Sequence, residues 1–274
     1  MRGLSLLRAT HLCSACQKPW GHAMEPGHMQ ASKQRRLLWP TEHMQAGQHH
    51  LPEAAAHYLL KVLRLQPGDS LELFDGAGQR ATACLQPGAQ LTVAAVSHCC
   101  EPTAALQVLV GLPEPERADW LVEKLTELGA TTISFVHCER SQGKPVARLH
   151  TGRLQRWQRL AEAAARQSGR YRIPEVQPLQ PLRSCVEAVD GAAQRFVASA
   201  TGTAGAFTDA AATGGKQAAA DAALAVLVGP PGGLTPDELQ MVQQRGYTEL
   251  WLSHFVLRTE TAAVAAATTL LRSV

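Results

Sequence analysis

The stretch from Leu227 to Ala262 constrains the fold most, because it holds two sharp turns, each directly after a short apolar run. The first turn, Gly229-Pro230-Pro231-Gly232-Gly233-Leu234, follows Ala225-Val226-Leu227-Val228 and leads into Thr235-Pro236-Asp237-Glu238. A threonine N-cap, a proline at the first helical position and a glutamate that can close a capping box predict a helix there. Gly246 is placed to end that helix. The pattern is a strand, a glycine turn and a capped helix.

The glycines of the first turn predict contact between main chain and a small cofactor. Gly232 and Gly233 carry no Cβ, so backbone amides can approach a ligand closely. The second turn, Val256-Leu257-Arg258-Thr259-Glu260-Thr261-Ala262, comes about one βα unit later. The spacing matches neither GxGxxG nor GxxxxGK[ST], which excludes the dinucleotide and P-loop fingerprints. An ordinary tight βα turn is the alternative interpretation.

Strand-like and helical segments alternate after Glu101-Pro102, which predicts an α/β fold with a mainly parallel sheet. Helical spacing of apolar residues predicts helices over 118–128, before Gly129, and over 153–168. Residues 202–221 read as a loop or a weak helix. Short apolar runs predict strands at 105–112, 132–138, 195–200, 225–228 and 249–252.

Short β segments fill the chain from Arg35 to about Cys100 and predict a small β-barrel. Asp69 to Phe74 alternates polar and apolar residues, and Asp75-Gly-Ala-Gly78 predicts a hairpin turn. Segments 80–85 and 91–96 are the expected return strands.

Residues 1–33 lack a helical or strand period, and we interpret them as a dispensable or misassigned leader. Cys13-x-x-Cys16, flanked by His11 and His22, offers four zinc ligands. A structural zinc site needs four well-placed ligands and this chain has no second spaced pair, so we predict no metal. Seven scattered cysteines do not form a disulfide framework, which favours a reducing cytoplasm. No apolar run reaches the roughly 18 residues of a membrane span.

Positive charge is concentrated between Glu139 and Arg172. This segment contains nine Lys or Arg residues and two Glu, a local net charge of +7 in a chain of net charge +3. On the helix predicted over 153–168, the basic side chains share one face and the apolar side chains the other. Such a stripe either follows nucleic-acid phosphates or is an ordinary solvated face. Lys61 and Arg64, beside an apolar stripe, leave the same two interpretations.

Five motifs occur in the order seen in a known family, and the segments around Val62-Leu-Arg-Leu65 and Leu73-Phe-Asp-Gly76 fit its first domain. The chain resembles the 16S rRNA (uracil-N3) methyltransferases of the RsmE type, in the SPOUT superfamily, from about Arg35 to Leu271. The motifs are Glu123-Lys-Leu-Thr-Glu-Leu-Gly129, Cys138-Glu-Arg-Ser141, the helix from Trp157 to Arg170 with Ile173-Pro174, Leu227-Val-Gly-Pro-Pro-Gly-Gly-Leu234, and Leu257-Arg-Thr-Glu-Thr-Ala262.

The resemblance implies a PUA-like β-barrel RNA-binding domain over 34–101 and a methyltransferase domain over 102–274 with a mainly parallel sheet and a trefoil knot. It implies S-adenosylmethionine as cofactor and methylation of N3 of a specific uridine in 16S rRNA, a step of ribosome biogenesis. The implied partners are small-subunit rRNA or the assembled 30S subunit and a second copy in a homodimer, with neither membrane nor DNA.

The resemblance also assigns site residues, with alternatives left open at several of them. Arg258 and Arg140 are the expected charge-stabilising groups, because guanidinium presents fixed paired donors. Glu260 either accepts a hydrogen bond from cofactor or base or, with Thr259, caps the last helix. Cofactor contacts are expected from Leu227, Val228, Gly229, Gly232, Gly233, Leu252, Ser253 and Leu257. RNA contacts are expected from Lys61, Arg64, Arg156, Arg159, Arg166, Gln167, Arg170 and Arg172, of which Gln167 is alternatively a helix cap.

Three positions depart from the family pattern. Pro231 stands where the family has glutamate, and it removes a carboxylate and a backbone donor. Ser253 and Phe255 stand where a glycine and an arginine are usual. They leave open a second function, a catalytically weakened rRNA-binding or ribosome-assembly protein on the same fold.

Overall fold

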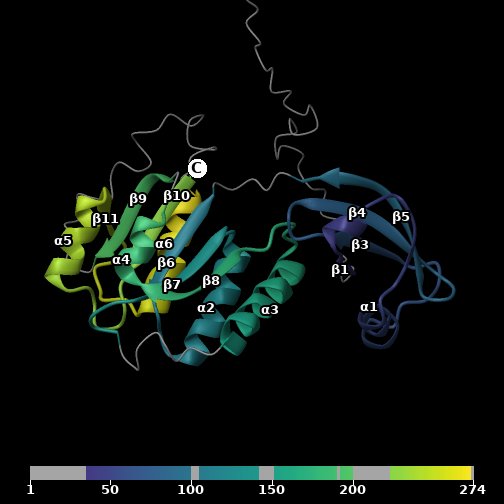
Figure 1. Ribbon diagram of the computed structural model, residues 1–274, viewed down its shortest axis with the longest axis horizontal. Helices are drawn as coiled ribbons and strands as arrows, with labels where there is room; N and C mark the ends of the chain where they lie inside the picture. The colour runs from purple at the N-terminus through teal and green to yellow at the C-terminus, as the bar shows by residue number, and fades with distance from the viewer. Residues whose placement is uncertain (1–34, 100–104, 142–150, 190–191, 200–222, 273–274) are drawn as a thin grey trace, which may run out of the picture. The chain divides into compact units, whose positions relative to one another are not determined.

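A computed structural model describes residues 35–99, 105–141, 151–189, 192–199 and 223–272, which form two β-sheets with their helices (Figure 1). The leader with Cys13 and Cys16, and the segment 202–221, lie outside the described residues. Within these ranges no helix combines the length and apolar character needed to cross a membrane.

The first sheet has five strands in the order β1-β3-β4-β5-β2, so β1 and β2 are its edges. β1 pairs with β3 in parallel, and the other pairs are antiparallel. Trp39, Leu59 and Leu73 lie in a buried cluster against this sheet. The elements are β1 (Arg36–Leu38), η2 (Thr41–His43), β2 (Gly47–His50), α1 (Glu53–His57), the π-turn η3 (Tyr58–Val62), β3 (Ser70–Phe74), β4 (Gln79–Gln86) and β5 (Gln90–His98).

The predicted hairpin turn joins β3 and β4. Asp75 shapes it, because its Oδ1 accepts hydrogen bonds from the backbone N–H groups of Ala77 at 2.8 Å and Gln79 at 2.9 Å. An aspartate that bonds its own following backbone is a standard turn former. The local sequence was therefore sufficient to place this turn.

The second sheet has six strands in the order β11-β9-β10-β6-β7-β8, and every neighbouring pair is parallel. The prediction of a mainly parallel α/β fold is confirmed. The edge strand β8 was not predicted, because Pro178 and Pro181 interrupt its pattern, and an edge strand tolerates proline. The strands are β6 (Leu106–Gly111), β7 (Thr132–His137), β8 (Glu175–Pro181), β9 (Ala192–Ser199), β10 (Ala223–Val228) and β11 (Tyr247–Trp251).

Alternate residues of β10 enter two different cores, which shows that helices cover both faces of the sheet. Val226 and Val228 pack with α2 (Pro115–Leu128), α3 (Thr151–Ser168) and α6 (Thr259–Arg272). Ala225 and Leu227 pack with α4 (Leu182–Glu187) and α5 (Pro236–Gln244). This alternation follows from the two-residue period of a strand, and burial on both faces explains why β10 is a continuous apolar run.

The predicted helix ends are confirmed. The Thr235 hydroxyl accepts a hydrogen bond from Glu238 N, and the Glu238 carboxylate accepts one from Thr235 N, which completes the capping box of α5. Gly129 ends α2 with a φ of 109°, and Gly246 follows α5 with a φ of 83°. Glycine adopts these left-handed conformations without a Cβ clash.

Two buried thiols and one buried phenol lower the stability of the fold at alkaline pH. Burial raises the pKa of the Cys138 thiol from 9.0 to about 12, of the Cys185 thiol from 9.0 to about 11, and of the Tyr247 hydroxyl from 10.0 to about 12. Because each pKa is higher in the folded state, the stabilisation is complete below pH 9 and is lost as the pH rises toward 12. Urea unfolding should show a falling free energy of unfolding above pH 9.

Tyr247→Phe is the matched control for this pH dependence, because it removes one of the titrating groups and keeps the ring. Its unfolding free energy should decline less steeply between pH 10 and 11 than that of the wild type. Parallel curves would contradict the assignment of the decline to these buried groups.

Candidate functional site

The two turns identified in the sequence meet at the carboxyl edge of the parallel sheet. The strand order changes direction between β6 and β10. β7 and β8 are added on one side of β6, and β9, β10 and β11 lie on its other side. Ligands of open α/β sheets bind at such a switch point, outside the carboxyl ends of the strands. The turn after β10 lies there, and the turn after β11 leads into α6, which packs against β6 and β10.

A direct bond joins the two turns. Thr259, the first residue of α6, donates from its hydroxyl to the carbonyl of Gly229 at 3.1 Å. The Thr259 side chain is buried, which fits this structural role. The segment 252–258 therefore ends beside the glycine turn. Two segments that are distant in sequence bring their main chains together there.

The glycine turn is held in a tight conformation. Gly233 donates from its N–H to the carbonyl of Pro230 at 2.8 Å and has a φ of 71°. A Cβ on Gly232 would lie 2.9 Å from the carbonyl oxygen of Arg140, whereas a Cβ on Gly233 would meet nothing within 4 Å. Gly232 is therefore required by packing, and Gly233 is required by its backbone angle.

Gly111, at the end of β6, was not among the predicted site residues. A Cβ there would lie 2.3 Å from the nitrogen and 2.5 Å from the Cα of Pro230, so the two main chains touch. A lone glycine that ends an otherwise apolar strand run is the sequence signal for such a close approach. Gly111 fixes the glycine turn against the neighbouring strand.

The loop after β7 supports the turn from the other side. Arg140 donates from Nη1 to the carbonyl of Leu234 at 3.3 Å and lies 3.5 Å from that of Gly232. Glu238, the capping residue of α5, also accepts a hydrogen bond from the backbone N–H of Glu139 at 2.8 Å. Arg140 is thus at the site, and in this structure its guanidinium braces the glycine turn.

The turn after β11 places Arg258 and Glu260 in contrasting surroundings. Arg258 is exposed, and within the described part of the chain no hydrogen bond or ion pair engages its guanidinium. Glu260 is buried in the first turn of α6, and Arg117 of α2 donates a short hydrogen bond to its carboxylate. Arg258 presents its side chain at the surface, whereas Glu260 ties α6 to α2.

Apolar side chains surround the main chain of the two turns. Leu227 and Val228 have buried side chains, so only their main chain faces the turn. Leu252 and Leu257 are partly buried against the same core as α6. Small-molecule sites in proteins are commonly lined by apolar side chains together with a few main-chain polar groups. The Ser253 Oγ accepts a hydrogen bond from the backbone N–H of Phe255 at 3.1 Å, which orders this turn locally.

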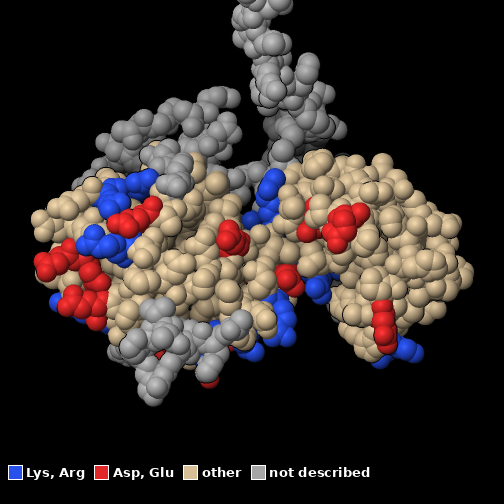
Figure 2. Space-filling view, viewed as in Figure 1, with Lys and Arg blue, Asp and Glu red and all other residues tan. Residues whose placement is uncertain are grey.

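Most of the side chains predicted to contact RNA are exposed. Lys61, Arg64, Arg156, Arg159, Gln167 and Arg172 all lie at the surface. Arg64 has a φ of 56°, an uncommon conformation for a residue with a side chain. Arg156 is paired with Asp119 at 2.8 Å. On the face drawn in Figure 2, Lys and Arg form small groups separated by acidic and uncharged residues.

Arg170 differs from the other residues predicted to contact RNA, because it is buried. Its residue is only 8% exposed, and its Nη1 donates to the carbonyls of Thr126 at 2.8 Å and Ala130 at 2.9 Å. Thr126 lies in the last turn of α2 and Ala130 two residues beyond its end, where helices leave acceptors without intrahelical donors. In this structure Arg170 therefore caps the end of α2 from a buried position. Arg166 is half-buried, with its guanidinium 5.1 Å from the centre of the Tyr58 ring.

Two family models place this combination, a parallel sheet with a main-chain turn site and a small mixed sheet, in the class of RNA methyltransferases that carry a PUA domain. A family model described as RNA methyltransferase domain matches residues 100–271, and one described as RNA methyltransferase PUA domain matches residues 51–90. The chain belongs to the ribosomal RNA small subunit methyltransferase E family.

Two relatives of that name are 30% and 34% identical to this chain over the aligned residues. The protein from Synechocystis is 30% identical over 223 residues, which are 79% of this chain and 70% of the relative. The protein from Mycobacterium bovis is 34% identical over 215 residues, which are 75% of this chain and 79% of the relative. A crystal structure of the Neisseria gonorrhoeae enzyme bound to S-adenosyl methionine matches with a TM-score of 0.71 and 28% identity, covering 85% of this chain and 94% of that one.

Proposed function

We propose that this chain transfers a methyl group from S-adenosylmethionine to N3 of a specific uridine in 16S rRNA. It is an S-adenosylmethionine-dependent rRNA methyltransferase by family, and its relative from Neisseria gonorrhoeae was crystallised with that cofactor. The observation that carries the proposal is the junction of the two main-chain turns at Gly229 and Thr259. Main chain around Gly229, Gly232, Leu252 and Leu257 would hold the cofactor.

The reaction requires a change in the protonation of the base. N3 of uracil lies between two carbonyls, and its lone pair is delocalised, so it becomes nucleophilic only when its proton leaves. When bound, the cofactor supplies an electrophilic methyl group. The protein must orient the base, accept or relay the N3 proton, and stabilise the charge that develops on O2 and O4.

Arg258 is the residue best placed to stabilise that charge. Its guanidinium is exposed beside the cofactor turn, and two parallel N–H donors suit a carbonyl oxygen that gains negative charge. Arg140 would hold the glycine turn in place and present its remaining donors to base or phosphate. Glu260 would set the position of Arg258 through its ion pair with Arg117, because its carboxylate is already engaged.

The remaining features complete the proposal. We divide the chain into a leader over 1–33, a PUA-like RNA-binding domain over 34–101 and a knotted methyltransferase domain over 102–274. We place the protein in the cytoplasm as a homodimer that acts on small-subunit rRNA or the 30S subunit. The target uridine must be unpaired or extruded, because a duplex blocks the edge that carries N3.

Mass spectrometry of 16S rRNA from a deletion strain tests this function. One methyluridine should disappear on deletion and return with the wild-type gene, but not with Arg258→Ala. An unchanged modification profile on deletion would instead favour the weakened RNA-binding protein. That alternative is motivated by Pro231, Ser253 and Phe255. Phe255 is 81% exposed, and it stands at a position where arginine is usual in the family.

A further inference from the structure

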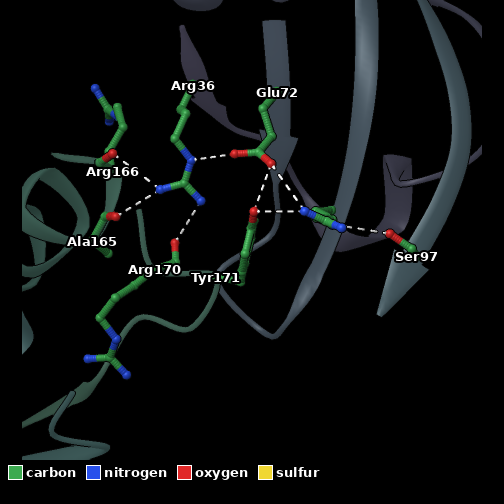
Figure 3. Close-up of polar contacts among 8 residues, drawn as sticks. Arg36, Glu72, Ser97, Ala165, Arg166, Arg170 and Tyr171 are labelled. Carbon is green, nitrogen blue, oxygen red and sulfur yellow. Dashed lines mark hydrogen bonds and ion pairs between the residues drawn. The ribbon is translucent and has the colours of Figure 1, made fainter. Parts of the chain in front are cut away.

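Arg36 makes four polar contacts from a buried position in β1, although the sequence distinguishes it in no way from its neighbour Arg35. The residue is 2% exposed. Its Nε donates to Glu72 at 2.7 Å, its Nη1 to the carbonyls of Ala165 at 3.0 Å and Arg166 at 3.2 Å, and its Nη2 to the carbonyl of Arg170 at 2.9 Å (Figure 3). The guanidinium thus joins the first sheet to the end of α3.

The carbonyls of Ala165 and Arg166 lie in the last turn of α3, where helices leave acceptors without intrahelical donors, and that of Arg170 lies just beyond the helix. α3 ends at Ser168, Gly169 follows with a φ of 83°, and the last carbonyls of a helix carry partial negative charge. Arg36 supplies donors and positive charge to them from a strand 129 residues earlier in the chain than Ala165. Together with the backbone N–H of Arg170, which donates to the Ala165 carbonyl at 3.0 Å, Arg36 caps the end of α3.

The faces of the guanidinium are occupied as well as its edges. The centre of the Phe74 ring lies 4.4 Å from the Arg36 Cζ, and that of the Tyr171 ring lies 4.9 Å away. The Tyr171 hydroxyl donates to Glu72 at 2.8 Å, so the same carboxylate holds both Arg36 and Tyr171 (Figure 3). A planar fork fits this arrangement, and the ammonium group of lysine does not.

Main-chain bonds continue the junction on the other side of Tyr171. Gly78 donates to the carbonyl of Tyr171 at 3.1 Å, and Ile173 donates to the carbonyl of Gly76 at 2.9 Å. The β3–β4 hairpin therefore pairs with the segment that follows α3. The orientation of α3 relative to the first sheet is fixed by several directional contacts, with Arg36 at their centre.

The junction lies between two groups of exposed basic residues. α3 carries Arg156 and Arg159, whereas Lys61 and Arg64 lie in and just after the π-turn η3. Arg166 stacks on Tyr58, the first residue of that turn. Phosphates of a folded RNA have fixed spacings, so both groups can be engaged together only when their separation is held constant.

We propose that Arg36 is a positioning residue that fixes the basic side chains of α3 relative to those of the π-turn, so that one rRNA segment contacts both groups at once. The proposal rests on the proposed function in that rRNA is the ligand. A buried ion network is a poor source of stability compared with apolar packing of the same volume. What the network provides here is a defined orientation.

Arg36→Met tests the proposal, because methionine fills a similar volume without donors. In the full-length protein, the KM for 30S subunits or 16S rRNA should rise by on the order of tenfold, since two linked contacts become independent. kcat at saturating RNA and the S-adenosylmethionine dissociation constant from calorimetry should stay within about twofold of wild type, because the cofactor turns are untouched.

The salt dependence of RNA affinity supplies a second measurement, whose expected change a loss of folding would not produce. The slope of log affinity for RNA against log salt concentration reports the number of phosphates contacted, at about 0.7 per phosphate for single strands. Loss of simultaneous contact should reduce the magnitude of that slope by about one to two units. Arg35→Met is the matched control, because Arg35 pairs with Asp69 at the surface at 2.8 Å. It should retain the wild-type KM to within about twofold.

Tyr171→Phe is a milder second variant in case Arg36→Met does not fold. It removes the hydroxyl bonds to Glu72 and from Arg80 and keeps the ring, and it should raise KM in the same direction by a smaller factor. Wild-type KM and salt slope in the folded variants would overturn the proposal, as would a parallel loss of cofactor binding and kcat. If the wild-type protein methylates no rRNA, the proposed function fails, and the salt slopes for RNA binding still decide the role of Arg36.

Discussion

Arg258→Ala is expected to lower the rate of methyl transfer by about 10²- to 10³-fold, the usual effect of removing one charge-stabilising donor from an active site. The side chain is exposed beside the cofactor turn, so its removal leaves no cavity in the core. Single-turnover transfer of a labelled methyl group to 30S subunits measures the effect. The dissociation constant for S-adenosylmethionine should change by less than about threefold.

Two controls define the interpretation of Arg258→Ala. Arg258→Lys keeps the charge but loses the paired donors, so it should recover only part of the rate. Arg245→Ala removes an exposed arginine that pairs with Glu187 at 2.6 Å, away from the turns, and should leave the rate unchanged. A rate for Arg258→Ala within threefold of wild type would remove Arg258 from the catalytic machinery.

Gly111→Ala is expected to weaken S-adenosylmethionine binding at least tenfold and to destabilise the protein by about 1–3 kcal/mol. The new Cβ would lie 2.3 Å from the backbone nitrogen of Pro230, and backbone cannot rotate away as a flexible side chain can. The glycine turn must therefore move off β6. Calorimetry with the cofactor and urea unfolding measure the two effects.

Gly152→Ala is the matched control for Gly111→Ala. A Cβ at Gly152, in the first turn of α3, would meet nothing within 4 Å. Replacing glycine in a helix should leave cofactor binding unchanged and should stabilise the protein slightly, by up to about 1 kcal/mol. Tight cofactor binding by Gly111→Ala would show that the turn can move without loss of the site.

Elements with strong local signals could be predicted, and their residues show why. Thr235 and Glu238 form a capping box within four residues, and Asp75 forms a turn within five, so neighbours in sequence settle both structures. The apolar run of β10 predicted a strand buried on both faces. By contrast, β8 carries Pro178, and only its edge position makes that proline acceptable.

The candidate site was predictable in part. The glycine turn and the Arg258 turn were found because their motifs are local, and the structure joins them through Thr259 and Gly229. The environment of single charges was not predictable. Arg170 and Arg166 lie four residues apart in the same basic segment, yet Arg170 caps α2 while Arg166 stacks on Tyr58.

The sequence by itself determined the periods of the strands and helices, the residues that end them, and the order of motifs that indicates the family. These properties depend on residues within a few positions of one another, where covalent geometry limits the choices. Tertiary structure alone decided that Gly111 touches Pro230, that Arg117 holds Glu260, and that Arg36 caps α3. Each of these contacts joins residues more than 100 positions apart, so the packing of whole elements determines whether the partners meet.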